Sequence, residues 1–313
     1  MIRQFNNLND FEKAFPTEES CIEHFRDVRW PHGVACTFCG SMENVYELKK
    51  VGQYKCGDCR KKFGVRFDTI FADTKLPLRT WFKAIFLITS HKKGIASHQL
   101  AKDLGITQKS AWHVLHRIRE ASMTEEYKRP LLSGTIQADE TLVGGLEKNK
   151  HAKDRKHSAH GYGSMKTKIA VFGMIQTDGD LRLQKIKHVG DTKRIIQKNV
   201  RFRSTIHTDD APHHRWMYRE FEHRLVKHRL GEYVTKDGVT TNRIEGVFGH
   251  FKRSVNGVYH HLSDQHIDRY LGMFAWRWNR RDLDEGERVN ALLKSAQGHQ
   301  LPYKVLIRKD KVQ

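Results

Sequence analysis

The sequence has no long hydrophobic run, no secretory signal pattern and few acidic residues. No segment of its 313 residues approaches the roughly 20 consecutive apolar residues that a membrane-spanning helix needs. The N-terminus, MIRQFNNLNDFEKAF, lacks the cationic and then apolar pattern of a signal peptide. We therefore expect a cytoplasmic protein with no membrane partner. In that reducing compartment, cysteines act as metal ligands more often than as disulfides.

Acidic residues are outnumbered, with 36 Asp and Glu against 56 Lys and Arg, for a formal net charge of +20. This excess favours a polyanionic partner, because neutralising phosphates releases counterions. A ribosomal or merely basic protein would have the same composition, but the motifs below favour nucleic-acid binding. The length allows two or three domains, one of them with a sizeable core.

Within residues 1–75, four of the five cysteines form two Cys-x2-Cys pairs separated by sixteen residues. This spacing is typical of a four-cysteine zinc site, and segment 44–56 between the pairs predicts two short strands around Gly52. Because four thiolates leave no open coordination position, we expect one structural Zn²⁺ rather than a catalytic one. A pair of redox motifs is the alternative, and Cys21 is expected to be a buried apolar residue. The predicted ligands are Cys36, Cys39, Cys56 and Cys59.

Residues 76–130 have a helical pattern of apolar residues. One helix is predicted from Arg79 towards Gly94, and two shorter helices, capped by Ser97 and Thr107, flank a turn at Gly105. This arrangement predicts a helix-turn-helix, although plain packing units share the spacing. Side chains expected to be exposed on its second helix suit base edges and phosphates. The DNA-binding candidates are Gln108, Lys109, Ser110, His113 and Arg117.

Residues 131–281 change to a pattern of short apolar runs. Strands are predicted over 134–145, 168–179, 181–189, 203–210 and 224–228, with helices over 191–200, 213–222 and 240–255. Three strands followed by helix, strand, helix, strand and helix is the order of the RNase H-like fold. We therefore predict an α/β protein in which an RNase H-like mixed sheet with helices follows a zinc ribbon and a helix-turn-helix. Residues 282–313 form a C-terminal tail to which no role is assigned.

Three carboxylates occupy the positions that converge in such a fold. Asp139 lies on the first strand, Asp209 at the end of the fourth, and Glu245 on the last helix. Buried carboxylates are costly unless positive charge holds them, and a pair of divalent metal ions is the natural candidate. Glu140 and Asp210 are rivals, but Glu140 lies on the opposite face of its strand from Asp139, and Asp209 directly follows the apolar run.

The motifs ADETLVGG, HTDD and NRIEGVFGHFKRSVNGVYHHLSDQHIDRYLGMFAWRWNRR resemble those of DDE transposases of bacterial insertion sequences with an N-terminal zinc ribbon, of the ISXO2-like type. The resemblance extends from the ribbon to about Arg281. It implies Asp139, Asp209 and Glu245 as ligands of two Mg²⁺ (or Mn²⁺) ions. It also implies Lys252, two helical turns after Glu245, as a catalytic contact to phosphate; a solvent-exposed lysine is the alternative.

A transposase of this type would cleave the 3′ ends of its element at terminal inverted repeats and join them to target DNA. The resemblance implies double-stranded DNA as partner, a homodimer or larger assembly, and a nucleoid-associated bacterial protein. A DNA-binding regulator, a domesticated inactive transposase and an RNase H or junction nuclease are the competing hypotheses. The basic segment 147–168 predicts a phosphate-binding loop. The cluster of Tyr259, His260, His261 and His266 predicts phosphate contacts or a buried network rather than zinc.

Overall fold

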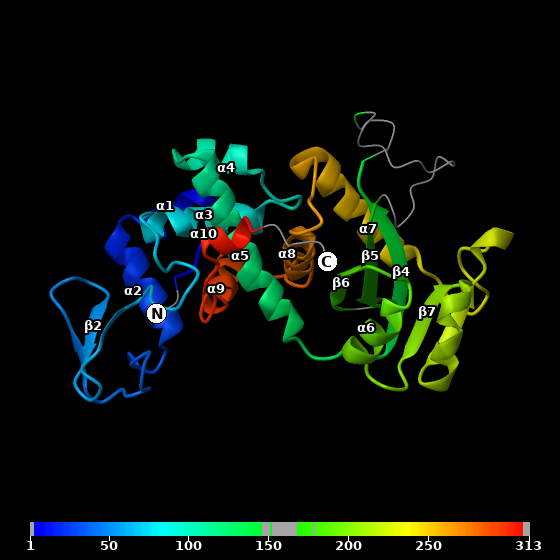
Figure 1. Ribbon diagram of the computed structural model, residues 1–313, viewed down its shortest axis with the longest axis horizontal. Coiled ribbons are helices and arrows are strands. Elements are labelled where there is room, and N and C mark those ends of the chain that lie inside the picture. The colour runs from blue at the N-terminus through cyan, green and yellow to red at the C-terminus, as the bar shows by residue number, and fades with distance from the viewer. Residues whose placement is uncertain (1–2, 146–150, 152–167, 178, 309–313) are drawn as a thin grey trace. The chain divides into compact units, whose positions relative to one another are not determined.

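The computed structural model describes residues 3–145, 151, 168–177 and 179–308. The chain divides into two compact units. The first comprises Met1–Glu125 together with Arg280–Gln313, and the second comprises Glu126–Asn279 (Figure 1). Across the described residues, the helices are too short or too polar to cross a membrane.

The first unit is mainly helical. Its aromatic core includes Phe11, Phe15, Trp81 and Phe82, all almost fully buried. The C-terminal residues belong to this core, since α9 packs against both α2 and α3. The helices are α1 (Leu8–Ala14), α2 (Glu18–Arg29), α3 (Leu78–Ser90), α4 (Ser97–Leu104), α5 (Gln108–Tyr127, whose last two residues belong to the second unit), α9 (Glu285–Lys294) and α10 (Tyr303–Leu306).

The predicted turn joins helices α4 and α5. Gly105, in the left-handed conformation at φ 62°, ends α4, which glycine adopts without steric cost. Thr107 caps α5 as predicted, because its hydroxyl accepts the backbone N–H of Ser110 at 3.2 Å. The predicted cap at Ser97 is wrong, because Ala96 occupies that position and Ser97 is the first helical residue.

The ribbon carries three short antiparallel strands in the order β1-β2-β3. These are β1 (Val45–Glu47), β2 (Gln53–Cys56) and β3 (Lys62–Gly64). The first two lie on either side of Gly52, as predicted, while the third was not anticipated. Its small core contains Tyr54, Phe63 and two of the cysteines.

The second unit contains a five-stranded sheet in the order β6-β5-β4-β7-β8. Strands β4 and β6 run antiparallel to β5, whereas β7 runs parallel to both β4 and β8. With the strands numbered from β4, this is the order 3-2-1-4-5 of the RNase H-like fold, which confirms the predicted fold class. The strands are β4 (Thr135–Val143), β5 (Ile169–Gln176), β6 (Leu181–Ile186), β7 (Thr205–Asp209) and β8 (Glu222–Val226).

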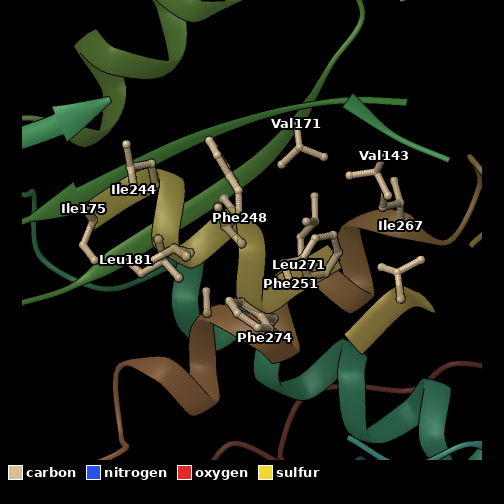
Figure 2. Close-up of a cluster of buried hydrophobic side chains, with 14 of the residues drawn as sticks. Val143, Val171, Ile175, Leu181, Ile244, Phe248, Phe251, Ile267, Leu271 and Phe274 are labelled. Atoms are coloured by element: carbon tan, nitrogen blue, oxygen red, sulfur yellow. The ribbon is translucent and has the colours of Figure 1, made fainter. Parts of the chain in front are cut away.

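Helices cover both faces of this sheet. One face packs against α7 and α8 through a cluster that includes Val171, Ile175, Phe248, Phe251 and Leu271 (Figure 2). The other face packs Ile136, Phe172 and Ile206 against residues of α6 and η3. The helical segments are α6 (Asp191–Asn199), η3 (Pro212–Arg219), η4 (His228–Leu230), α7 (Asn242–Ser254), η5 (Val255–Tyr259) and α8 (Ile267–Trp278).

The five strands and three of these helical segments, α6, η3 and α7, were predicted from the sequence, with two differences. The helix predicted over 213–222 is the 3-10 helix η3, and the fifth strand begins at Glu222 instead of residue 224. Both differences arise in the short connection between β7 and β8, where helical and extended patterns overlap.

Candidate active site and metal-binding sites

Asp139 and Asp209 project from the face of the sheet that α7 covers. Asp139 is the register partner of Gly173 on β5, so their side-chain positions share one face. A Cβ atom at Gly173 would lie 2.8 Å from both Ile244 and Phe248 of α7, which identifies that face. Thr205 of β7 pairs with Thr135 of β4, so the alternation of side chains brings Asp209 to the same face.

Two side chains of the sheet hold the beginning of α7 in place. The buried Gln137, two residues before Asp139, accepts the backbone N–H groups of Arg243 (2.9 Å) and Ile244 (3.3 Å) through its Oε1. These N–H groups belong to the first turn of α7, where no carbonyl within the helix is available to them. The backbone N–H of Thr240, just before the helix, donates to Nδ1 of His207 on β7 at 3.5 Å.

Glu245 lies in the first turn of α7, where the helix dipole favours negative charge. The hydroxyl of the buried Thr241 donates to Oε1 of Glu245 at 2.8 Å and lies 3.0 Å from Nε2 of His228. The same histidine nitrogen is 3.6 Å from the Glu245 carboxylate. Thr241 and His228 therefore fix the direction in which this carboxylate points, while its side chain remains 42% exposed.

The charges of neighbouring carboxylates act on Asp139. Burial is the largest effect on Asp139, and the negative charges of Glu140, Asp209 and Glu245 add to it. Together they raise the pKa of Asp139 to about 7, although the Glu140 N–H bond opposes the shift. Such mutual repulsion is what a divalent cation relieves.

This carboxylate set suits hard cations, because all its donors are oxygen. Among the described residues, the three carboxylates do not form a group with all ligand atoms within 4.8 Å of one another. A pair of ions about 3.5–4 Å apart spreads its ligands more widely than a single ion does. These three carboxylates therefore do not form a compact site for a single ion.

The other candidates near this site take different directions. Lys252 is exposed in the last turn of α7. Glu140 turns to the opposite face of the sheet, where its Oε1 lies 3.0 Å from Nε2 of His213. Gln137, Thr241 and His228 were not predicted from the sequence. Gln137 shares a strand face with Asp139 through the two-residue alternation, and that spacing could have revealed it.

The four ribbon cysteines meet as predicted. Their sulfur atoms all lie within 4.8 Å of one another, with Cys36 and Cys59 at 3.6 Å and Cys39 and Cys56 also at 3.6 Å. Zn–S bonds of about 2.3 Å in a tetrahedron separate sulfur atoms by about 3.8 Å, so the site fits one structural Zn²⁺. Cys21 lies apart from them, fully buried in the first unit.

Two of the predicted DNA-binding residues make hydrogen-bonding contacts within the first unit. Arg117 is 5% exposed, and its guanidinium donates to the backbone carbonyls of Ile70, Ala72 and Leu301. The expectation that Arg117 lies exposed is therefore wrong, because the carbonyls of two other segments hold it inside. A ring nitrogen of the half-buried His113 also lies 2.9 Å from the Leu301 carbonyl.

The remaining candidates on α5 lie at its N-terminal end. Gln108 and Lys109 are exposed and Ser110 is half-buried. The Lys109 ammonium lies 4.7 Å from the centroid of the Tyr303 ring in α10, so the C-terminal segment borders this surface. Of the predicted loop 147–168, only residues 151 and 168 are described. His260 and His261 are exposed, whereas Tyr259 packs against the ring of Tyr270.

The fold and the ribbon define a zinc-ribbon protein with an RNase H-like domain. Comparison with family models makes the class specific: residues 131–279 match the ISXO2-like transposase domain, and residues 16–62 match the transposase zinc-ribbon domain. The chain therefore carries an ISXO2-like transposase domain and, N-terminal to it, a transposase zinc-ribbon domain.

A relative from Halobacterium salinarum, described as an uncharacterized protein in transposable element ISH50, is 25% identical over 286 residues. The match covers 85% of this chain and 92% of the relative. Among solved structures, the Mos1 transposase paired-end complex with the left transposon end matches at 10% identity and a TM-score of 0.26, over 70% of this chain and 80% of that one. The Mos1 strand transfer complex matches at 12% identity and a TM-score of 0.23, over 70% and 78%. At these TM-scores the structural similarity supports no conclusion, and the fold class rests on the strand order described above.

Proposed function

We propose that this protein is an active DNA transposase that cleaves the 3′ ends of its element and joins them to target DNA. The observation that carries the proposal is the convergence of Asp139, Asp209 and Glu245 from three separate elements. The first two project from the α7 face of the sheet, and the third is held at the first turn of α7. The raised pKa of Asp139 supports a site built for cations.

Asp139, Asp209 and Glu245 would hold two Mg²⁺ or Mn²⁺ ions. When bound, the ions supply the positive charge that activates the attacking oxygen and stabilises the leaving oxygen. Two sets of hydrogen bonds keep Glu245 in position: those among His228, Thr241 and Glu245, and those from the first turn of α7 to Gln137, here called the Gln137 clamp. Little reorganisation is therefore needed when DNA binds. Lys252, exposed on α7, would contact a phosphate that flanks the reacting one.

The reaction has two steps of the same kind. First, a water oxygen attacks the phosphorus at the transposon end, the bond from phosphorus to the 3′ oxygen breaks, and that oxygen takes up a proton to become a 3′-OH. This 3′-OH then attacks a target phosphodiester and displaces the target's own 3′ oxygen. Neither step needs a covalent intermediate between protein and DNA.

DNA recognition is assigned to the N-terminal end of α5. Lys109 and Gln108 are exposed there, and the net charge of +20 favours a polyanion. Lys109 and Ser110 suit phosphate contacts, and Gln108 suits an adenine edge. A homodimer or larger assembly would bring two ends together.

The test is incubation of purified protein with Mg²⁺ and a labelled duplex that carries the terminal repeat of its own element. Wild type should cleave and join strands, Asp139→Asn should do neither, and chelation should stop the reaction. Asp210→Asn is the matched control, because it removes a neighbouring carboxylate without touching the proposed ligands. Equal binding by wild type and Asp139→Asn without cleavage by either would identify a DNA-binding regulator or an inactive descendant.

A further inference from the structure

A second group of potential metal ligands includes Glu140, whose side chain lies on the opposite face of β4 from Asp139. Glu140 of β4, His213 and His214 offer ligand atoms that all lie within 4.8 Å of one another. Oε1 of Glu140 is 3.0 Å from Nε2 of His213 and 3.6 Å from Nε2 of His214. The two imidazole rings have centroids 3.9 Å apart at the start of η3.

His214 is a fully buried residue of this group whose ring nitrogens the described fold leaves without partners. Its side chain is 0% exposed, and among the described residues neither of its ring nitrogens has a hydrogen-bond partner. Burying an unsatisfied polar group costs about 1–3 kcal/mol, so such a group in a native interior calls for a ligand. Its Nε2 faces two carboxylates, those of Glu140 and, at 3.8 Å, Asp209.

The donors are those of a borderline transition metal rather than of Mg²⁺. Two imidazoles and one carboxylate suit Zn²⁺, whereas Mg²⁺ prefers oxygen ligands. Tetrahedral Zn²⁺ with bonds of about 2.0–2.1 Å separates neighbouring ligand atoms by about 3.3 Å. The observed 3.0 and 3.6 Å separations fall on either side of that value.

We propose that Glu140, His213 and His214 form a second Zn²⁺ site, separate from the ribbon and from the carboxylates assigned to Mg²⁺. A fourth position remains open to water or another donor. The ion would tie β4 to η3 beside the end of β7, where Asp209 lies. The site does not depend on the proposed transposase activity, because none of its three ligands is a proposed Mg²⁺ ligand, and His214 is within 3.8 Å of Asp209.

The test is calorimetric titration of the full-length protein with Zn²⁺, after its ribbon has been loaded with one equivalent, without DNA. Wild type should bind one further equivalent that a large excess of Mg²⁺ does not displace. His213→Ala and Glu140→Gln should weaken this binding at least about tenfold, since even outer-shell partners of zinc contribute that much. Both residues are partly exposed, so these variants are expected to fold, which a thermal melt checks.

Two control variants decide where the ion lies. His188→Ala removes an exposed histidine of the same unit and should bind like wild type. Asp139→Asn, which should abolish DNA cleavage, should keep the second zinc equivalent. The proposal is overturned if wild type binds only the ribbon zinc, or if His213→Ala keeps the second equivalent. A loss in Asp139→Asn as large as in His213→Ala would assign the ion to the carboxylates proposed as Mg²⁺ ligands and also overturn it.

Discussion

Single side chains set the geometry of the candidate active site, and Gln137 is the clearest case. It is buried and satisfies two N–H groups in the first turn of α7. We expect Gln137→Leu to destabilise the protein by about 1–3 kcal/mol, because two buried donors lose their acceptor. Strand cleavage should fall more, roughly a hundredfold, since Glu245 loses its fixed position.

Thermal melts and cleavage rates measure the two effects of Gln137→Leu. Gln176→Leu, on the neighbouring strand and half-buried, is the matched control and should change the cleavage rate little. If Gln137→Leu cleaved DNA at the wild-type rate while losing stability, the clamp would be structural only.

A second residue-scale prediction concerns pH. His24 is 2% exposed, and its Nε2 lies 2.7 Å from Oδ1 of Asn290. Burial lowers its pKa, so the folded protein keeps it neutral where the unfolded chain, with a pKa of about 6.5, takes up a proton. Stability should therefore fall as pH decreases below about 6.5, because protons bind preferentially to the unfolded state.

Denaturant midpoints between pH 7.5 and 5 measure this dependence. His24→Gln keeps a donor for Asn290 but does not titrate, so its stability should fall less over the same range. An identical pH dependence in wild type and His24→Gln would remove His24 as the cause.

At the scale of elements, the close packing of α7 on β5 depends on Gly173. A Cβ atom there would lie 2.8 Å from Phe248 and Ile244, and the Phe248 ring has little room to move within the core. We expect Gly173→Ala to cost about 1–3 kcal/mol and to lower cleavage, because α7 and its Glu245 shift away from the sheet. Gly246→Ala is the control, since it meets open space on the same helix and should stabilise it by about 0.5–1 kcal/mol. Melting temperatures of the two variants should therefore change in opposite directions, and the cleavage rate should fall only in Gly173→Ala; equal behaviour would contradict the packing argument.

Helix α5 has a buried arginine midway along its length and an exposed N-terminal end. Mutations should separate their effects on stability from those on DNA binding. Arg117→Gln should cost about 3 kcal/mol or more, since buried carbonyls of Ile70, Ala72 and Leu301 lose a charged donor. Lys109→Ala should change stability by less than about 1 kcal/mol but reduce the salt dependence of DNA binding by about one phosphate contact. Melts and binding at several salt concentrations test both, and unchanged DNA affinity in Lys109→Ala would move the interface elsewhere.

Helix α5 and the turn before it also show which features could be predicted from the sequence and which could not. The turn at Gly105 and the cap at Thr107 were predictable, because the residues at these positions specify them locally. The burial of Arg117 was not, because its partners lie in two segments far away in sequence. In the same way, the three carboxylates could be proposed from strand order, and strand alternation places Gln137 on the same face as Asp139. The hydrogen bonds that Gln137 and His228 make are tertiary, and no local pattern encodes them.

At the scale of the whole molecule, the order of strands could be predicted from the sequence. That the C-terminal residues 282–313 belong to the first unit could not. The sheet order follows from five short apolar runs and the connections between them. Residues 282–313 carry no motif, yet α9 buries Val289, Leu292 and Leu293 and packs on α2 and α3. The first unit is therefore discontinuous in sequence, whereas the second is one segment with its own core.

This asymmetry predicts different outcomes for two truncations. A chain that ends at residue 279 loses three buried apolar side chains from its first unit, worth roughly 5 kcal/mol or more, against a typical total stability of about 5–15 kcal/mol. We expect its first unit to melt at a much lower temperature or to aggregate.

The fragment 126–279 should unfold cooperatively, and its first residue is anchored because Glu126 accepts a hydrogen bond from Asn279 at 2.6 Å. Calorimetry of both, with a synthetic 280–313 peptide added to restore the first, measures this. A chain 1–279 as stable as the full-length protein would contradict a structural role for α9, since burial of its apolar face is then dispensable.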